Sequence, residues 1–152
     1  MIKLNFPDFK FRFKNSENKV SIFCEIRKKF IFLTPEEWVR QNVVQFLLLQ
    51  KKYPKSLINV EKALKINGLT KRYDVVVFNN DGSINILVEC KSTDIKISQT
   101  TFDQIARYNL TLNANFLMVT NGLNHYFCKI SPNVGIGNEK YFFLENLPDY
   151  FV

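Results

Sequence analysis

Two apolar segments, residues 72–78 and 84–91, constrain the fold of this chain more than any other feature. Both are rich in β-branched residues, and the turn-forming residues 79–82 between them predict a β-hairpin. Because side chains alternate along a strand, one face would carry Val76, Phe78 and Leu87, and the other Val75, Val77, Ile86, Val88 and Cys90. Both faces are apolar, so we expect this hairpin to lie in a sheet that is covered on both sides.

A helix is predicted to begin at Thr34. This residue fits the N-cap, Pro35 fits the first helical position, and Glu37 is placed to complete a capping box. Pro54 predicts an end near Tyr53, because proline cannot continue a helix.

The remaining patterns predict a mixed β-sheet flanked by α-helices (α/β or α+β class), preceded by an N-terminal β-hairpin. A second helix is expected over residues 101–112, capped by Ser98 or Thr100. Further strands are expected over residues 9–13, 20–26, 30–33, 57–66, 116–120, 125–130 and 140–144, with turns at Asn67-Gly68 and Asn121-Gly122.

Composition predicts one basic domain. The 152 residues carry a formal net charge of +7, and 46% of them are hydrophobic, which excludes a disordered chain. No linker or repeat divides the sequence, so we expect a single domain over residues 1–152, with an extension over 1–33 and a core over 34–145. The excess of Lys, Phe and Asn resembles the bias of an AT-rich coding sequence, so charge alone does not predict nucleic-acid binding.

Several classes of protein are excluded. No apolar run approaches the about 18 residues of a transmembrane helix, and the N-terminus lacks a signal-peptide pattern. Cys24, Cys90 and Cys128 are odd in number and far apart, which argues against a disulfide framework or a zinc site. His125 is the only histidine, so a Ser-His-Asp triad is not expected. We expect a cytoplasmic protein that does not enter membranes.

The central hairpin also brings chemically reactive side chains together. If its loop has two residues (81–82) or four (80–83), cross-strand partners have residue numbers that add up to 163, and Asp74 lies opposite Glu89. Directly opposed residues share a face, and alternation adds Lys91 to it. A three-residue loop would shift the pairing and separate the two carboxylates.

Two opposed carboxylates beside an apolar layer repel each other and are costly to bury. A divalent cation would remove this conflict, and oxygen ligands favour Mg²⁺. Such an ion can polarise a phosphoryl oxygen and activate a water molecule, while Lys91 orients that water or offsets the developing charge. The alternative is a solvated surface salt bridge among Asp74, Glu89 and Lys91.

The first helix offers an additional acid. Glu36 shares a helical face with the apolar stripe of Val39, Val43 and Leu47, so it could reach the metal site. Complementarity with the helix dipole explains an acid in the first turn equally well. Whether Glu36 or Glu37 is the helix-borne acid therefore stays open.

The second helix carries Gln104 and Tyr108, which are four residues apart and share a face. Both side chains can bind a phosphate or orient the lysine. The alternative is a surface position for Gln104 and a core position for Tyr108.

These motifs resemble the PD-(D/E)XK nuclease superfamily, in which an Asp on one strand is followed by Glu-x-Lys on the next, here Asp74 and Glu89-Cys90-Lys91. Five segments in order are similar to the N-terminal domain of type I restriction enzyme R subunits, and more closely to its small stand-alone bacterial relatives. They are TPEEWVRQ (34–41), KRYDVVV (71–77), ILVECK (86–91), FDQIARYN (102–109) and VTNGLNH (119–125). The usual Pro before the Asp is replaced by Tyr73, at a position that varies widely in the superfamily.

The resemblance covers about residues 20–145 and implies a restriction-endonuclease-like fold that cuts DNA with Mg²⁺, or with Mn²⁺ in its place. It implies Asp74 and Glu89 as metal ligands, Lys91 as the catalytic lysine, Glu36 as the helix-borne acid, and Gln104 with Tyr108 as an accessory motif. R subunits continue into a helicase motor that these 152 residues do not contain. We therefore expect either helicase, methylase or specificity subunits as partners, or an independent nuclease, with a homodimer as another option.

The expected contacts to nucleic acid are Lys71, Arg72, Lys96 and Arg107, whose charges would neutralise phosphates. Arg72 would share the face of Asp74. Two alternatives to a DNA endonuclease remain: a catalytically silent nuclease-fold module that binds DNA or a partner subunit, and an RNA-directed nuclease.

Overall fold

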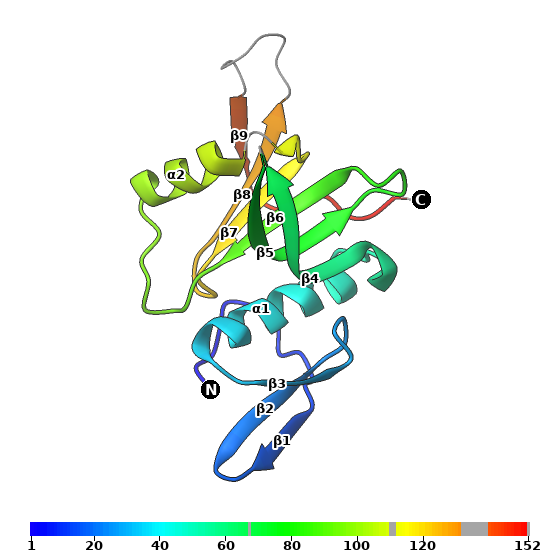
Figure 1. Cartoon of the computed structure of the whole chain (residues 1–152). Coiled ribbons are helices and arrows are strands. Elements are labelled where there is room, and N and C mark those ends of the chain that lie inside the picture. The colour runs from blue at the N-terminus through cyan, green and yellow to red at the C-terminus, as the bar shows by residue number, and fades with distance from the viewer. Residues whose placement is uncertain (67, 110–111, 132–139, 152) are drawn as a thin grey trace.

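A computed structural model of the chain describes residues 1–66, 68–109, 112–131 and 140–151. These residues form a three-stranded and a six-stranded sheet, and helix α1 lies between the two (Figure 1). The elements are β1 (Phe13–Ser16), β2 (Lys19–Cys24), β3 (Lys29–Phe32), α1 (Pro35–Gln45), η1 (Phe46–Gln50), η2 (Lys55–Leu57), β4 (Ile58–Ile66), β5 (Leu69–Phe78), β6 (Ile84–Cys90), α2 (Gln99–Asn109), β7 (Phe116–Thr120), β8 (His125–Ser131) and β9 (Lys140–Leu144). The predicted mixed sheet with flanking helices and N-terminal antiparallel strands is confirmed.

The six-stranded sheet has the order β4-β5-β6-β7-β8-β9. Only β6 and β7 pair in parallel among its described neighbours, and α2 forms the crossover between them (Figure 1). One face packs against α1 and the other against α2. The α1 side contains Val39, Val43, Leu47, Val75, Val77, Ile86, Val88 and Cys90, and the α2 side contains Val76, Leu87, Phe102 and Ala106. The central hairpin is thus covered on both sides, as its pattern predicted.

The N-terminal aromatic residues differ from the prediction. The strand expected over residues 9–13 is wrong, because strand pairing covers only Phe13–Ser16. The rings of Phe11 and Trp38 lie 5.0 Å apart in an edge-on contact, so aromatic packing on α1 replaces a longer ladder. The stretch from residue 20 to residue 33 forms two antiparallel strands, β2 and β3.

The helices also differ at their ends. The first helix continues beyond Gln45 only as the π-helical turn η1, so the predicted end near Tyr53 is too late. Tyr53 instead donates its amide to Leu47 (3.0 Å) and its hydroxyl to the Pro148 carbonyl (2.9 Å), which turns the chain back toward the sheet. Helix α2 begins at Gln99 rather than at residue 101. The Ser98 hydroxyl accepts the Thr101 amide and so caps the N-terminus of this helix.

Three residues of the predicted elements, Asn67 of the expected turn and residues 110–111 of the second helix, lie outside the described residues.

The turn between β5 and β6 corrects the predicted loop length. Asn79 and Ser83 close the turn, since the Asn79 amide donates to the Ser83 carbonyl (2.8 Å), and three residues lie between them. Phe78 pairs with Ile84 and Val77 with Ile86, so Asn85 is an additional, unpaired residue on β6. This irregularity restores the predicted register, and the partners from Val75–Val88 to Val77–Ile86 have residue numbers that add up to 163.

The N-terminal segment closes the core beside the turn that follows β7. Leu4 and Phe6 are buried on the α1 side, and the Asn5 amide donates to the Gly122 carbonyl (2.8 Å). His125 bonds the Asn5 carbonyl (2.7 Å) through Nε2 and the Thr120 hydroxyl (2.7 Å) through Nδ1. His125 therefore joins the N-terminal segment to β8.

Replacing Gly122 with Ala is expected to lower the free energy of unfolding by about 2–4 kcal/mol. Gly122 has φ +88°, and a Cβ there would lie 2.8 Å from Leu4 Cδ2 and 3.0 Å from Val39 Cγ2. The control is Gly82→Ala, which has the same φ but no atom within 4 Å of the new Cβ. It should cost only about 1–2 kcal/mol for the backbone conformation. Urea denaturation measures both, and equal losses would contradict the steric explanation.

Candidate active site

The candidate site lies where the regular pairing of β5 and β6 ends. Pairing extends to Val75 and Val88, and beyond it the Asp74 side chain bonds the partner strand directly: Oδ2 accepts the Cys90 amide at 2.8 Å. The other oxygen, Oδ1, accepts from Arg40 Nη2 at 2.8 Å. Asp74 is 9% exposed and Glu89 is 8% exposed. Both acids are therefore held in a largely dehydrated position.

Glu89 is the second-last residue of β6. Burial raises its pKa, and the Asp74 charge adds to this, while Lys71 and Lys91 oppose it. Lys71 Nζ lies 3.0 Å from Glu89 Oε1. The predicted grouping of Asp74, Glu89 and Lys91 is thus present as a set of interacting charges, and Lys71 belongs to the same set.

Glu36 completes the acidic group from the first turn of α1. Partial burial raises its pKa, and the neighbouring Asp74 carboxylate raises it further, whereas Arg40 and Lys91 lower it. The side chain is 49% exposed. The pKa of Glu36 thus responds to the Asp74 charge, and the side chain is open to solvent.

Glu37 has a different role from the one predicted. The Thr34 hydroxyl accepts the Glu37 amide at 3.0 Å, which confirms the N-cap. The Glu37 carboxylate accepts from Arg27 (2.6 Å), Arg40 (2.6 Å) and Gln41 (2.9 Å). In a capping box it would instead accept the backbone amide of the N-cap residue Thr34. Because cations surround it, Glu37 is a buried structural acid.

Sequence reasoning missed Arg40 and Glu61. Arg40 Nη2 lies 2.9 Å from Glu61 Oε1, and Arg40 is 7% exposed. Burial lowers the pKa of Arg40, but Asp74 and Glu37 outweigh this and raise it above its usual range. The ion pair between Arg40 and Glu36 (3.3 Å) had a sequence signal, because residues four apart on a helix are neighbours.

Glu61 lies across from Asp74 on β4, because the pairs on either side of it are Val60–Val75 and Lys62–Tyr73. It has φ +57° and makes no ladder pair of its own. The neighbouring strands β4, β5 and β6 therefore each contribute one acid to the site, namely Glu61, Asp74 and Glu89.

The alternation of faces changes at Asp74. Tyr73 packs in the α2-side cluster together with Val76, whereas strict alternation would have placed it with Val75 on the α1 side. The prediction that Asp74 follows the face of Val76 is therefore wrong, since its carboxylate bonds Arg40 of α1. Glu61, which lies across from Asp74 on β4, also departs from regular strand geometry, because its φ is +57°.

The remaining predicted residues are spread more widely. Arg72 is 66% exposed and lies 3.7 Å from Glu61, at the border of the acidic group. Gln104, Lys96 and Arg107 are exposed, and no described contact joins them to Asp74, Glu89 or Lys91. The Tyr108 side chain lies outside the described residues.

A cation fits the acidic group by its chemistry. Glu36 and Glu89 both have raised pKa values, to which the Asp74 charge contributes, so added positive charge would relieve the repulsion. Within the described ranges, no group of three or more His, Cys, Asp or Glu side chains is already gathered as a metal site. The donor set on hand is therefore Asp74 and Glu89, with Glu36 nearby.

Replacing Glu89 with Gln is expected to change how stability depends on pH. The folded pKa of Glu89 is raised above its ordinary value of 4.5, so the folded state holds this proton more tightly. Its contribution is present at low pH and is lost as pH rises from about 4.5 through the folded pKa. Urea denaturation from pH 4 to pH 7 should show Glu89→Gln gaining stability relative to wild type, and a constant difference would contradict this.

The fold and the site define a mixed α+β domain with a buried cluster of acids and bases at the end of its central hairpin. A family model described as type I restriction enzyme R protein N terminus matches residues 35–148. The chain belongs to this family, which relates it to restriction systems. None of the curated proteins compared with it matches. No described helix is long and apolar enough to cross a membrane.

Proposed function

We propose that this protein is a Mg²⁺-dependent DNA endonuclease of a restriction system that hydrolyses phosphodiester bonds with a metal-activated water molecule. The observation that carries the proposal is the grouping of Glu36, Asp74, Glu89 and Lys91 where the regular pairing of β5 with β6 ends. Asp74 raises the pKa of both Glu36 and Glu89, and carboxylates with perturbed pKa values are typical of functional sites. Membership of the R protein N-terminal family supports the same conclusion.

Asp74 and Glu89 would hold the Mg²⁺, with Mn²⁺ as a substitute, and Glu36 would approach it from α1. When bound, the ion would supply Lewis acidity and lower the pKa of a water molecule. The Lys91 ammonium would orient the attacking water or neutralise charge on the phosphoryl group. Burial of the two ligands keeps the dielectric constant low, which strengthens each of these interactions.

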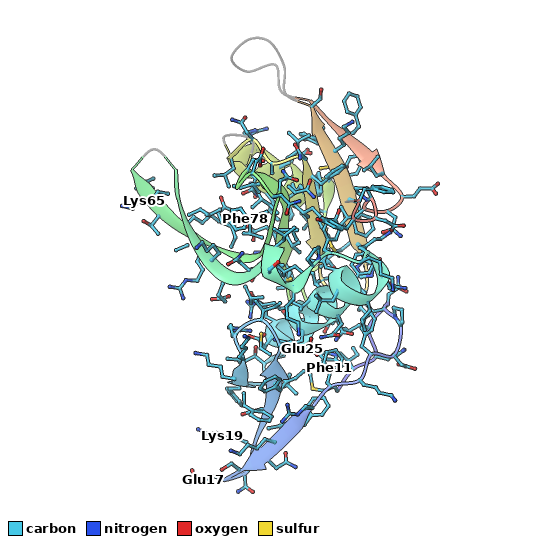
Figure 2. The ribbon with its side chains drawn as sticks, turned by 90° about the vertical axis from the view of Figure 1, so that its right-hand side faces the viewer. Phe11, Glu17, Lys19, Glu25, Lys65 and Phe78 are labelled. Atoms are coloured by element: carbon cyan, nitrogen blue, oxygen red, sulfur yellow. The ribbon has the colours of Figure 1, made fainter. Side chains whose placement is uncertain are left out.

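DNA would approach over the β4–β5 hairpin. Figure 2 shows Lys65 near the end of this hairpin, on an arm that extends away from the body of the protein. Arg72 lies on the same arm and is exposed, so both charges can neutralise phosphates leading to the site. Lys96 and Arg107 remain proposed contacts on the α2 side, and Lys71 would act inside the site through Glu89.

The proposed partners are DNA and the other subunits of a restriction system, such as a helicase, methylase or specificity subunit. A homodimer would place two such sites on one duplex. Gln104 and Tyr108 remain proposed accessory residues from α2.

Cleavage of supercoiled plasmid tests the proposal. Wild-type protein is expected to nick or linearise DNA with Mg²⁺ but not with EDTA, and Asp74→Ala should lower the rate by at least about 10²-fold. The matched control is Glu145→Ala, an exposed acid in the segment after β9. Cleavage that survives Asp74→Ala would overturn the assignment. Labelled RNA run beside the plasmid separates a DNA nuclease from an RNA nuclease.

One observation favours a catalytically silent module as the second candidate. Arg40 already occupies Asp74 Oδ1 at 2.8 Å, as a permanent replacement for a metal would. Such a module would bind DNA or a partner subunit without cutting. Calorimetric titration that detects DNA binding but no Mg²⁺ binding would favour it.

A further inference from the structure

We infer that Arg40 is the resident counter-ion of the proposed metal site, holding Asp74 Oδ1 in the metal-free protein and competing with the divalent cation for that oxygen. Arg40 is thus a positioning residue that sets the affinity for metal. This inference rests on the proposed function, because it takes Asp74 as a metal ligand.

The contacts of Arg40 are divided unequally between its two terminal nitrogens. Nη1 bonds Glu37 at 2.6 Å. Nη2 faces three carboxylates instead: Asp74 (2.8 Å), Glu61 (2.9 Å) and Glu36 (3.3 Å). A terminal guanidinium nitrogen carries two hydrogens, so three acceptors exceed what it can bond at one time. Nη2 can therefore release Asp74 and still have two partners.

The bond between Arg40 Nη1 and Glu37 holds one side of the guanidinium in place while Nη2 changes its partners. Glu37 is 3% exposed and is also held by Arg27 and Gln41, so it cannot follow a movement at Nη2. Arg40 Nε is buried and has no hydrogen-bond partner among the described residues. The guanidinium is therefore held by Glu37 through Nη1, and on the side of the site Nη2 can change its partners among three carboxylates.

Competition follows from charge and burial. Asp74 is 9% exposed, and its Oδ2 accepts the Cys90 amide while its Oδ1 accepts from Arg40. A metal ion that binds Oδ1 would share that oxygen with the Arg40 guanidinium. Like charges at short range repel strongly in a dehydrated site. Metal binding therefore requires Arg40 to shift toward Glu36 and Glu61.

Calorimetric titration with Mg²⁺ alone tests this inference. Arg40→Gln is expected to bind Mg²⁺ at least about tenfold more tightly than wild type. Arg27→Gln is the matched control, because it removes the same charge from the same acid, Glu37, without touching Asp74. It should change the affinity less than about threefold.

A second measurement uses unaltered protein, so it decides the question even if Arg40→Gln fails to fold. The guanidinium nitrogen resonances of Arg40 should shift saturably during an NMR titration with Mg²⁺, while those of Arg27 stay in place.

The outcomes separate the inference from the proposed function. Equal Mg²⁺ affinities for wild type and Arg40→Gln, or unmoved Arg40 resonances while Mg²⁺ binds, would overturn the role of Arg40 and leave the metal site intact. Binding only after Arg40→Gln would support the inference in its strongest form. No binding by any variant would overturn the inference and the proposed metal site together.

Discussion

Replacing Lys91 with Met is expected to slow Mg²⁺-dependent plasmid cleavage by about 10²-fold or more. The Lys91 amide donates to the Thr120 carbonyl at 2.8 Å, which fixes the backbone directly after β6. Its charge reaches Glu36 and Glu89, so the ammonium lies within the electrostatic range of the site. Methionine keeps most of the aliphatic stem and removes the charge. Initial cleavage rates measure the effect.

Two controls define what a loss of cleavage by the Lys91 variant means. Lys55→Met removes an exposed lysine that pairs with Glu25 at 3.4 Å, and it should cleave at the wild-type rate. Mg²⁺ affinity of Lys91→Met should be unchanged or higher, since removing a positive charge does not weaken cation binding. A cleavage rate within about threefold of wild type would show that Lys91 has no part in the chemistry.

Replacing Glu37 with Ala is expected to lower the free energy of unfolding by about 3–5 kcal/mol. The side chain is 5% exposed and bonds Arg27 and Arg40 at 2.6 Å each, so its loss removes a buried partner from two cations. Urea denaturation, with the unfolding slope compared between variants, measures the change.

The control for this substitution is Glu25→Ala, which breaks a surface pair with Lys55 whose side chains are 43% and 54% exposed. Exposed pairs of this kind contribute about 0–1 kcal/mol. If Glu37→Ala lost no more stability than Glu25→Ala, the buried network would not be a structural element.

The features that were predictable from sequence are those that depend on neighbours along the chain. The helix start at Thr34 follows from side chains that bond their own backbone within one turn. The covered hairpin follows from the apolar character of both its faces. The register from Val75–Val88 to Val77–Ile86 was also predicted, although from a loop length that is wrong, and the regular pairing ends before Asp74 and Glu89.

The features that were missed depend on contacts between distant segments. A helical arginine such as Arg40 is ordinarily solvated, and only the arrangement of β4 and β5 against α1 buries it among four acids. The aromatic residues before β1 alternate like a strand, yet packing of Phe11 on Trp38 outweighs that pattern. Local periodicity does not contain either piece of information.

The additional residue on β6 has a consequence for how this hairpin can change in evolution. Asn85 compensates the three-residue turn, so turn length and strand length are coupled. A deletion at the turn alone, or at Asn85 alone, would slide one strand past the other and turn every side chain to the opposite face. Insertions and deletions here should therefore survive only as matched pairs, which would leave homologous hairpins of different lengths with the same register next to the two acids.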